Sequence, residues 1–283
     1  MATRDPQDLR SLCSGMLKIV CELGVDSAVR SDMVVAMAEL LSLRGVSRSF
    51  QRGRSGGRLR VLVDLSLDVA RGEIVAVVGS RAEGKTTLLE IAAGIDVPDA
   101  GQVWLDKVEL TRLSGEDRAE LLGPDIRWVR REGTGVRFEV LDYVGLPLVV
   151  GRDHGYRAAE ELALAALERV GGAGCAGLRW EDLSNWERVL VALARGIVGV
   201  PQLLVIDDLM DGLGMRRTRQ AGELLCSLVG ELGCGVLMSA SDLEAVLVAD
   251  RVLYFERGGL KVISDHGAYE AEVIPLHRQA PAG

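Results

Sequence analysis

The alternation of apolar and polar residues predicts that the main folded part of this chain begins with strands. Residues 41–50 and 60–69 alternate with the period of a strand. The link between them, residues 51–57, is rich in Gly, Ser and Arg and is predicted to be a mobile turn. Residues 74–78 are a short, unbroken apolar run, which is typical of a buried strand.

Strands and helices follow in mixed order after this run. A hairpin is predicted over residues 101–110 and a strand over 126–129, and residues 203–206 form a second buried apolar run. Residues 157–170 place apolar side chains at helical spacing on a charged background. The whole interval 115–184 is predicted to be mainly helical.

The first 37 residues differ in pattern and are predicted to be a separate N-terminal piece. Residues 9–23 and 32–43 both carry apolar side chains at roughly helical spacing. One interpretation is a helical extension. The other is that the native protein starts at Met33 or Met37 and that the upstream residues do not belong to it. The pattern leaves both open.

Composition narrows the class of protein. The chain has 283 residues, of which 48% are hydrophobic, so one large α/β domain or two small ones can bury a core. The net charge is −8 and no long basic run occurs, which argues against a nucleic-acid partner. Five cysteines, without CxxC spacing, are typical of a reducing compartment. No run is long enough to span a bilayer and no signal peptide is recognisable, so a cytoplasmic protein is predicted.

A phosphate-binding loop follows the buried strand at residues 74–78. The chain has Gly79, four further residues, and then Gly84, Lys85 and Thr86, which matches the phosphate-loop pattern in full. In this arrangement backbone N–H groups and a helix N-terminus face a polyphosphate. We expect Lys85 to bind the β/γ-phosphates and the Thr86 hydroxyl to bind Mg²⁺. The predicted nucleotide-binding residues are Gly79, Ser80, Arg81, Ala82, Glu83, Gly84, Lys85, Thr86 and Thr87.

Three further residues bear on how this predicted site would bind a nucleotide. Ala82 and Glu83 stand where such loops usually carry small residues, often Gly, and the Glu83 carboxylate is like-charged with a phosphate, which puts the affinity in doubt. Phe50, the only aromatic residue before the loop, is a candidate to stack on an adenine base. A core role at the end of a strand is the alternative for Phe50.

The second buried strand supplies the carboxylates that such a site needs. It ends in Asp207 and Asp208. An acid at the end of a buried strand can hold the Mg²⁺ shell, and a second acid can orient the attacking water. We therefore predict Asp207 as the metal ligand and Asp208 as the catalytic residue that orients the attacking water.

Residues 183–214, LSNWERVLVALARGIVGVPQLLVIDDLMDGLG, resemble the ATP-binding subunits of ABC transporters. Residues 140–148 and the Asp250-Arg251-Val252 strand with its Gly258-Gly259 turn resemble the lipoprotein-release and macrolide-export group. The resemblance covers about residues 38–262. It implies a phosphate-loop NTPase with a RecA-like α/β core, an antiparallel β subdomain and an inserted helical subdomain.

The same resemblance implies domain boundaries and a mode of assembly. The ATPase domain would span residues 38–264, with the helical subdomain at about 115–184 and a C-terminal tail at 265–283. The family forms head-to-tail dimers in which ATP lies between the phosphate loop of one subunit and the signature segment of the other. A homodimer and a heterodimer with another ABC ATPase both remain open, as does the identity of the membrane permease.

The sequence departs from the family at the groups that support hydrolysis. The LSGGQ signature is replaced by Leu183, Ser184, Asn185, Trp186 and Glu187. Arg131 stands in place of the usual glutamine, Asp208 in place of the catalytic glutamate, and Ser241 in place of the switch histidine. A displacement of about 1 Å can lower a rate on the order of 100-fold, and Asp is one methylene shorter than Glu.

The sequence therefore predicts an ATP-binding subunit that uses ATP and Mg²⁺, hydrolyses ATP slowly by itself and acts with a membrane permease. It would be cytoplasmic and peripheral at the inner face of the membrane, reaching the membrane only through the permease. A non-catalytic, ATP-dependent regulatory or binding protein with the same fold is the alternative. A full-rate ATPase would require Asp208 to act without the switch histidine.

Overall fold

The computed structural model describes residues 39–52, 57–131, 138–151, 154–240 and 246–265, all within one compact unit, Met37–Gly283. The predictions for the N-terminal piece before residue 39, for the turn at 53–56, for Ser241 and for the tail after residue 265 fall outside the described residues. The domain boundaries drawn from the family resemblance therefore stay predictions.

An antiparallel sheet forms from the first alternating strands and the predicted hairpin. Its strand order is β2-β1-β4-β5. The strands are β1 (Glu39–Gln51), β2 (Arg58–Ala70), β4 (Ala100–Leu105) and β5 (Val108–Glu109). These bounds confirm the strands predicted at 41–50 and 60–69 and the hairpin predicted at 101–110.

The helical spacing assigned to residues 32–43 is wrong for its last five residues, which belong to β1. Leu41 pairs with Val69 of β2 on one side and with Leu105 of β4 on the other. Both edges of this segment are therefore hydrogen-bonded, and Leu40, Leu41 and Leu43 are at most 1% exposed. Pairing with distant strands has overridden the local period.

A second sheet has six strands in the order β10-β9-β3-β8-β7-β6. It is parallel from β9 to β6, and only β10 is antiparallel to its neighbour. The strands are β3 (Ile74–Val78), β6 (Ile126–Arg130), β7 (Leu203–Asp207), β8 (Gly235–Ala240), β9 (Arg251–Glu256) and β10 (Gly259–Asp265). All residues of β7 and β8 are buried, as expected for parallel strands covered on both faces.

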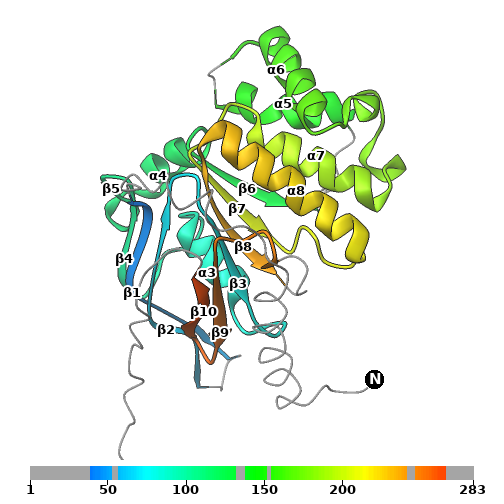
Figure 1. Ribbon diagram of the computed structural model, residues 1–283. Coiled ribbons are helices and arrows are strands. Elements are labelled where there is room, and N and C mark those ends of the chain that lie inside the picture. The colour runs from blue at the N-terminus through cyan, green and yellow to red at the C-terminus, as the bar shows by residue number, and fades with distance from the viewer. Residues whose placement is uncertain (1–38, 53–56, 132–137, 152–153, 241–245, 266–283) are drawn as a thin grey trace, which may run out of the picture. The chain divides into compact units, whose positions relative to one another are not determined.

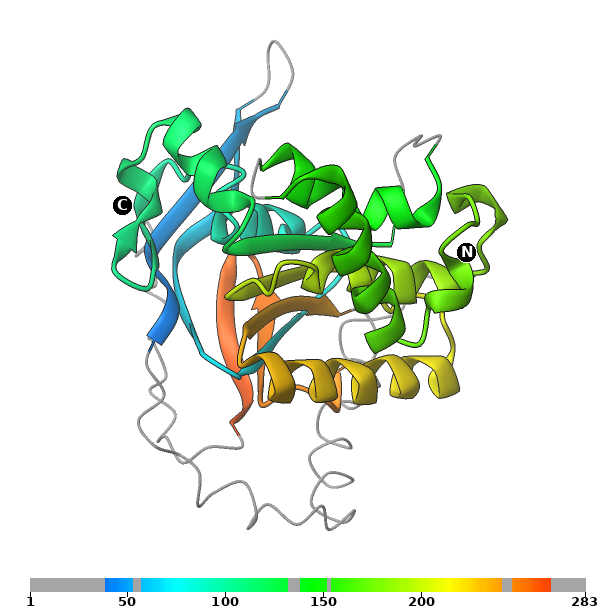
Figure 2. The same cartoon turned by 90° about the horizontal axis from the view of Figure 1, so that it is seen from above.

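Six α-helices and three short 3₁₀ turns complete the described part of the chain. They are α3 (Lys85–Ala92), α4 (Gly115–Leu122), α5 (Val140–Val150), α6 (Tyr156–Arg169), α7 (Asn185–Ile197), α8 (Met215–Leu232), η1 (Leu110–Arg112), η2 (Ala173–Cys175) and η3 (Trp180–Asp182). Figure 1 shows α5, α6 and α7 grouped at one end, away from the antiparallel sheet. Figure 2 shows α8 running alongside strands of the six-stranded sheet.

This architecture confirms the predicted α/β class with an antiparallel β part and an inserted helical part. The interval 115–184 also contains β6, which joins the six-stranded sheet beside β7. One core cluster connects leucines of β1 and β2 with α3 and with β3, β7 and β8. The helix that carries the end of the phosphate loop is therefore packed into the core shared by both sheets.

The parallel register brings the candidate residues to one edge. Val78 at the end of β3 lies beside Ala240 at the end of β8, and Arg130 of β6 lies beside Asp207 of β7. Carboxyl ends of parallel strands meet at the same edge of a sheet, where ligands of open α/β folds bind. The phosphate loop, Asp207 and Arg130 are therefore neighbours although they are far apart in sequence.

Candidate nucleotide site

The loop between β3 and α3 needs its two glycines for steric reasons. A Cβ at Gly79 would lie 2.7 Å from the Phe255 carbonyl oxygen, and one at Gly84 would lie 2.5 Å from Val61 Cγ1. Gly84 also has φ +121°, which a residue with a side chain rarely adopts. Ala82 has φ +63°, an unfavourable conformation for a residue other than Gly, at one of the loop positions that usually carry small residues.

Lys85 is held inside this loop. Its side chain is only 6% exposed, and its Nζ donates to the carbonyl oxygens of Gly79 (2.8 Å) and Ser80 (2.9 Å). A buried ammonium at the start of a helix, next to a glycine-containing loop, is a site for a polyanion. The structure thus places Lys85 where the sequence predicts a phosphate-binding lysine.

Asp207 is the buried carboxylate of the site. It is 6% exposed, its Oδ2 lies 3.2 Å from Thr86 Oγ1, and its Oδ1 accepts a hydrogen bond from Ser239 Oγ at 2.9 Å. Arg130 Nη2 lies 3.6 Å from Asp207 Oδ2. Burial raises the pKa of Asp207, as does its neighbour Asp208, while Ser239, Arg130 and Thr86 act in the opposite direction.

Asp208 follows in a left-handed conformation with φ +44°. Its backbone N–H donates to Ser239 Oγ at 2.8 Å, and its own Oδ1 lies 3.2 Å from the same oxygen. Ser239 is 2% exposed. One buried hydroxyl therefore lies within hydrogen-bond distance of both carboxylates that the sequence assigns to metal binding and to water positioning.

Two arginines connect the loop after β7 with the rest of the site. Arg81 of the phosphate loop forms an ion pair with Asp211 at 2.7 Å. Arg131, directly after β6, donates from Nη1 to the Asp211 carbonyl oxygen at 2.6 Å. Arg131, which the sequence predicts to stand in place of the family's glutamine, is therefore bonded to backbone beside the site.

The donor set fits Mg²⁺ bound together with nucleotide phosphates. Mg²⁺ usually takes one or two carboxylates plus phosphate oxygens and waters rather than an all-protein cage. Thr86 and Asp207 can supply a hydroxyl and one carboxylate. Within the described ranges no group of three or more His, Cys, Asp or Glu side chains is gathered as a separate metal site.

Comparison with known protein families matches residues 62–210 to the family described as ABC transporter. The chain belongs to the ABC transporter family. The matched residues include the phosphate loop, the Arg131 position, the altered signature and Asp207, so the ABC resemblance drawn from these segments is confirmed.

Curated relatives point to one group within the ABC family. The chain is 32% identical over 225 residues to the lipoprotein-releasing system ATP-binding protein LolD of Pseudomonas fluorescens, covering 79% of this chain and 98% of the relative. It is 37% identical over 205 residues to LolD of Bordetella pertussis, covering 72% and 88%. The predicted similarity to the lipoprotein-release group is therefore confirmed.

Solved structures agree on the fold. The ATP-binding cassette MJ0796, in a dimeric post-hydrolysis state bound to ADP and Pi, superposes with a TM-score of 0.72 at 22% identity, covering 78% of this chain and 96% of that one. A nucleotide-free ATP-binding cassette from an ABC transporter gives a TM-score of 0.67 at 19% identity, covering 78% and 89%. At these identities the likeness shows the fold alone.

The segment predicted to be the altered signature, residues 183–187, contains the start of α7. Ser184 is the N-cap, with its Oγ accepting the Glu187 N–H at 3.3 Å and the Glu187 Oε2 accepting the Ser184 N–H at 2.8 Å. Hydrogen bonds from Ser184 lower the pKa of Glu187. Among the described residues no hydrogen bond or ion pair joins this segment to the phosphate loop of the same chain.

The other signature residues differ in exposure. Leu183 is buried at 4% exposure, whereas Asn185, the first residue of α7, is exposed. The Trp186 ring packs under the guanidinium of Arg217 from α8, 4.6 Å from the ring centroid. The Trp186 ring is therefore already in contact with a side chain of its own subunit.

Phe50 lies near the end of β1 and keeps an exposed surface. It is 40% exposed, and the guanidinium of Arg48 lies 4.9 Å from its ring centroid. Arg48 is itself fixed by ion pairs to Asp96 and Asp99. The exposure argues against a pure core role, so stacking on a base stays a prediction.

Sequence reasoning did not find Ser239, Arg130 or a role for Asp211. The first two reach Asp207 only through the register of neighbouring strands, which a single sequence does not reveal. The capping box at Ser184 and Glu187 could have been found, because Ser followed three residues later by Glu is a known helix-start pattern.

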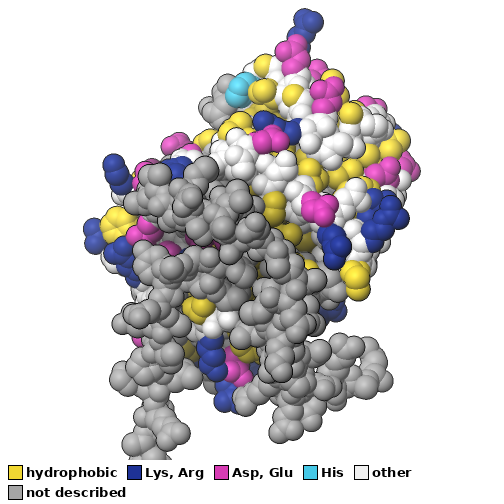
Figure 3. Space-filling model, in the orientation of Figure 1, with side chains coloured by type: hydrophobic (Ala, Val, Ile, Leu, Met, Phe, Trp, Pro, Cys, Tyr) yellow, Lys and Arg dark blue, Asp and Glu magenta, His cyan; other side chains and the backbone are white. Residues whose placement is uncertain are grey.

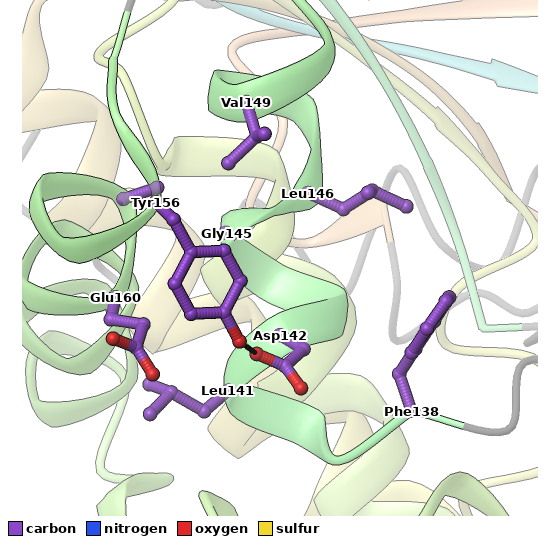
Figure 4. Close-up of a pocket in the computed structure, with 9 residues that line it drawn as sticks. Phe138, Leu141, Asp142, Gly145, Leu146, Val149, Tyr156 and Glu160 are labelled. Carbon is purple, nitrogen blue, oxygen red and sulfur yellow. Dashed lines mark hydrogen bonds between the residues drawn. The ribbon is translucent and has the colours of Figure 1, made fainter.

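A separate surface groove lies between α5 and α6, outside the nucleotide site. Figure 4 shows Tyr156 pointing its hydroxyl at Asp142, to which it donates a hydrogen bond that raises the pKa of Tyr156 to about 12. The groove is lined by Phe138, Leu141, Asp142, Gly145, Leu146, Val149, Tyr156, Ala159 and Glu160. None of these residues belongs to the predicted nucleotide site.

Two observations concern charge on the surface and the hydrophobicity of the helices. On the face in Figure 3, the coloured basic side chains lie scattered among acidic and apolar ones rather than in a continuous stripe. No helix in the described part of the chain combines the length and the apolar character needed to cross a bilayer.

Proposed function

We propose that this chain is the nucleotide-binding subunit of an ABC transporter complex and binds Mg–ATP through Lys85, Thr86 and Asp207. The observation that carries the proposal is the meeting of a buried lysine inside a complete phosphate loop with a buried, hydroxyl-linked aspartate at the same sheet edge. Lys85 would bind phosphate oxygens, and Thr86 with Asp207 would hold the metal. Bound Mg²⁺ would neutralise phosphate charge.

Hydrolysis by the isolated subunit is proposed to be slow. Asp208 is one methylene shorter than glutamate, and its carboxylate lies against Ser239. Arg131 is bonded to the Asp211 backbone and cannot accept a hydrogen bond from water. Of the two groups that would position a water, Asp208 therefore differs from the family pattern in reach and Arg131 differs in chemistry.

The partner is proposed to be a membrane permease, with an asymmetric pair of ATPase subunits. The relatives are ATP-binding proteins of lipoprotein-releasing systems, which supports a role in the same class of transporter. In a homodimer each composite site would combine Asp208 with a signature whose Ser184 N–H is already bonded to Glu187. In a heterodimer this subunit would hold ATP while an ordinary partner hydrolyses it.

Titration with a fluorescent ATP analogue tests the nucleotide site. Lys85→Ala should weaken binding about 10- to 100-fold, since a hydrogen bond to a charged group contributes about 1.5–3 kcal/mol. Lys107→Ala is the matched control, because Lys107 is exposed in the turn between β4 and β5. Equal binding by wild type and Lys85→Ala would show that the nucleotide binds elsewhere.

Reconstitution with the partner tests the asymmetric complex. Replacing the partner's catalytic glutamate should stop turnover, while Asp208→Asn in this chain should leave most of it. Loss of turnover with Asp208→Asn would instead make Asp208 a working catalytic residue and end the asymmetric proposal.

A further inference from the structure

The phosphate loop of this chain contains its own carboxylate. Glu83 is half-buried, and its Oε2 accepts a hydrogen bond from the Ser80 N–H at 2.9 Å. The same oxygen would lie 3.0 Å from a Cβ built on Gly79. An anionic oxygen therefore rests against the first residues of the loop, whose N–H groups are the usual ligands of phosphate in this motif.

The cation of the loop is bonded to the same two residues. Lys85 Nζ donates to the carbonyl oxygens of Gly79 and Ser80. The Gly79–Ser80 segment is thus held through its N–H by Glu83 and through its carbonyls by Lys85. A phosphate that recruits the Ser80 N–H has to displace the Glu83 oxygen, and the carboxylate then stays nearby as a like charge.

The Ser80–Glu83 bond has a close counterpart elsewhere in the chain. Ser184 and Glu187 are also three residues apart, and Glu187 Oε2 accepts the Ser184 N–H at 2.8 Å. The same spacing therefore folds a glutamate carboxylate back onto a serine amide in two unrelated surroundings. This recurrence indicates a stable local contact formed by the Ser-x-x-Glu sequence itself.

We propose that Glu83 determines the nucleotide affinity of this subunit by competing with the nucleotide phosphates for the Ser80 N–H and by repelling them. The inference rests on the proposed nucleotide function of the loop. Hydrogen bonds to charged groups are the stronger class, so releasing this one on binding weakens ATP affinity by about 10-fold or more.

The test compares Mg–ATP dissociation constants by isothermal titration for wild type, Glu83→Gln and Glu83→Ala. Glu83→Gln removes the charge but can keep the hydrogen bond, whereas Glu83→Ala removes both. Affinity should rise in the order wild type, Glu83→Gln, Glu83→Ala, with a gain of about 10-fold for Glu83→Ala. Glu161→Gln is the control for net charge, since Glu161 is an exposed residue of α6 with one long ion pair. It should bind like wild type.

A second measurement separates competition from a general change in the loop. Without nucleotide, the peptide that contains Ser80 should exchange its amide hydrogens faster in Glu83→Ala than in wild type, and added ATP should remove the difference. Thermal unfolding checks that each variant is folded, and Glu83→Gln retains the size of the side chain for that purpose.

Two failures are distinguishable. If Lys85→Ala weakens ATP binding about 10- to 100-fold while neither Glu83 variant binds ATP more tightly than wild type, the competition by Glu83 is refuted and the nucleotide site stands. If Lys85→Ala leaves ATP binding unchanged, the proposed function itself fails.

Discussion

Replacing Ser239 by alanine should destabilise the protein more than a typical serine substitution. Ser239 is 2% exposed, its hydroxyl donates to Asp207 Oδ1 at 2.9 Å, and it accepts the Asp208 N–H at 2.8 Å. A hydrogen bond to a charged group contributes about 1.5–3 kcal/mol, and leaving a buried polar group unsatisfied has a similar penalty. We expect Ser239→Ala to lower the free energy of unfolding by about 2–3 kcal/mol.

Urea unfolding followed by circular dichroism measures this loss. Ser42→Ala is the matched control, because Ser42 is also buried, at 5% exposure, but among the described residues its hydroxyl accepts only from Arg44 Nε at 3.1 Å. That control should lose about 1 kcal/mol or less. A double-mutant cycle of Ser239→Ala with Asp207→Asn should show a coupling energy of about 1 kcal/mol or more, since the two side chains are in contact.

Two results would refute this reasoning. One is a decrease in the free energy of unfolding for Ser239→Ala that equals the decrease for Ser42→Ala. The other is strict additivity with Asp207→Asn, which would mean that the Ser239 hydroxyl does not support the Asp207 carboxylate.

Three further predictions follow from the packing and the titrating groups. Gly101→Ala should lower the free energy of unfolding by about 2 kcal/mol or more, because Gly101 has φ +95° and a Cβ there would lie 2.5 Å from the Gly45 carbonyl oxygen. Gly171 has φ +74° but open space around it, so Gly171→Ala should lower the free energy of unfolding by only about 1 kcal/mol in the same assay. Burial raises the pKa of Glu73 above its ordinary value of 4.5. The stability that Glu73 contributes is therefore fully present below pH 4.5 and is lost as the pH rises through the raised pKa of the folded state. Glu73→Gln should flatten this part of a curve of unfolding free energy against pH, and an unchanged slope would contradict the prediction. Burial raises the pKa of Cys234 to about 11, so peptide mapping after mild alkylation should find half-buried Cys226 labelled well before Cys234, and equal labelling would argue against the packing around β8.

Local signals in the sequence were enough for the phosphate loop and its flanking strand and helix, because Gly79, Gly84 and Lys85 act within one short segment. Asp207 could be predicted from the end of a buried apolar run. The Ser239 and Arg130 contacts to Asp207 could not, because they depend on which strands lie side by side. The Arg81–Asp211 ion pair depends on the path of two loops that lie 130 residues apart in sequence.

The misassigned helical period at residues 39–43 has a related cause. Leu40, Leu41 and Leu43 have spacing that suits a helix, but β2 and β4 offer hydrogen-bonding edges on both sides of this segment. Pairing with β2 and β4 therefore makes this segment a strand, and no local feature of the sequence predicts that pairing.

The most direct test of the account is a paired measurement of ATP binding and steady-state phosphate release by the isolated chain. We predict that wild type binds Mg–ATP, that Lys85→Ala binds it about 10- to 100-fold more weakly, and that phosphate release is far below the roughly 1–100 per second typical of kinases. Ordinary turnover by wild type that Lys85→Ala abolishes would contradict the claim that this subunit binds ATP but hydrolyses it poorly alone.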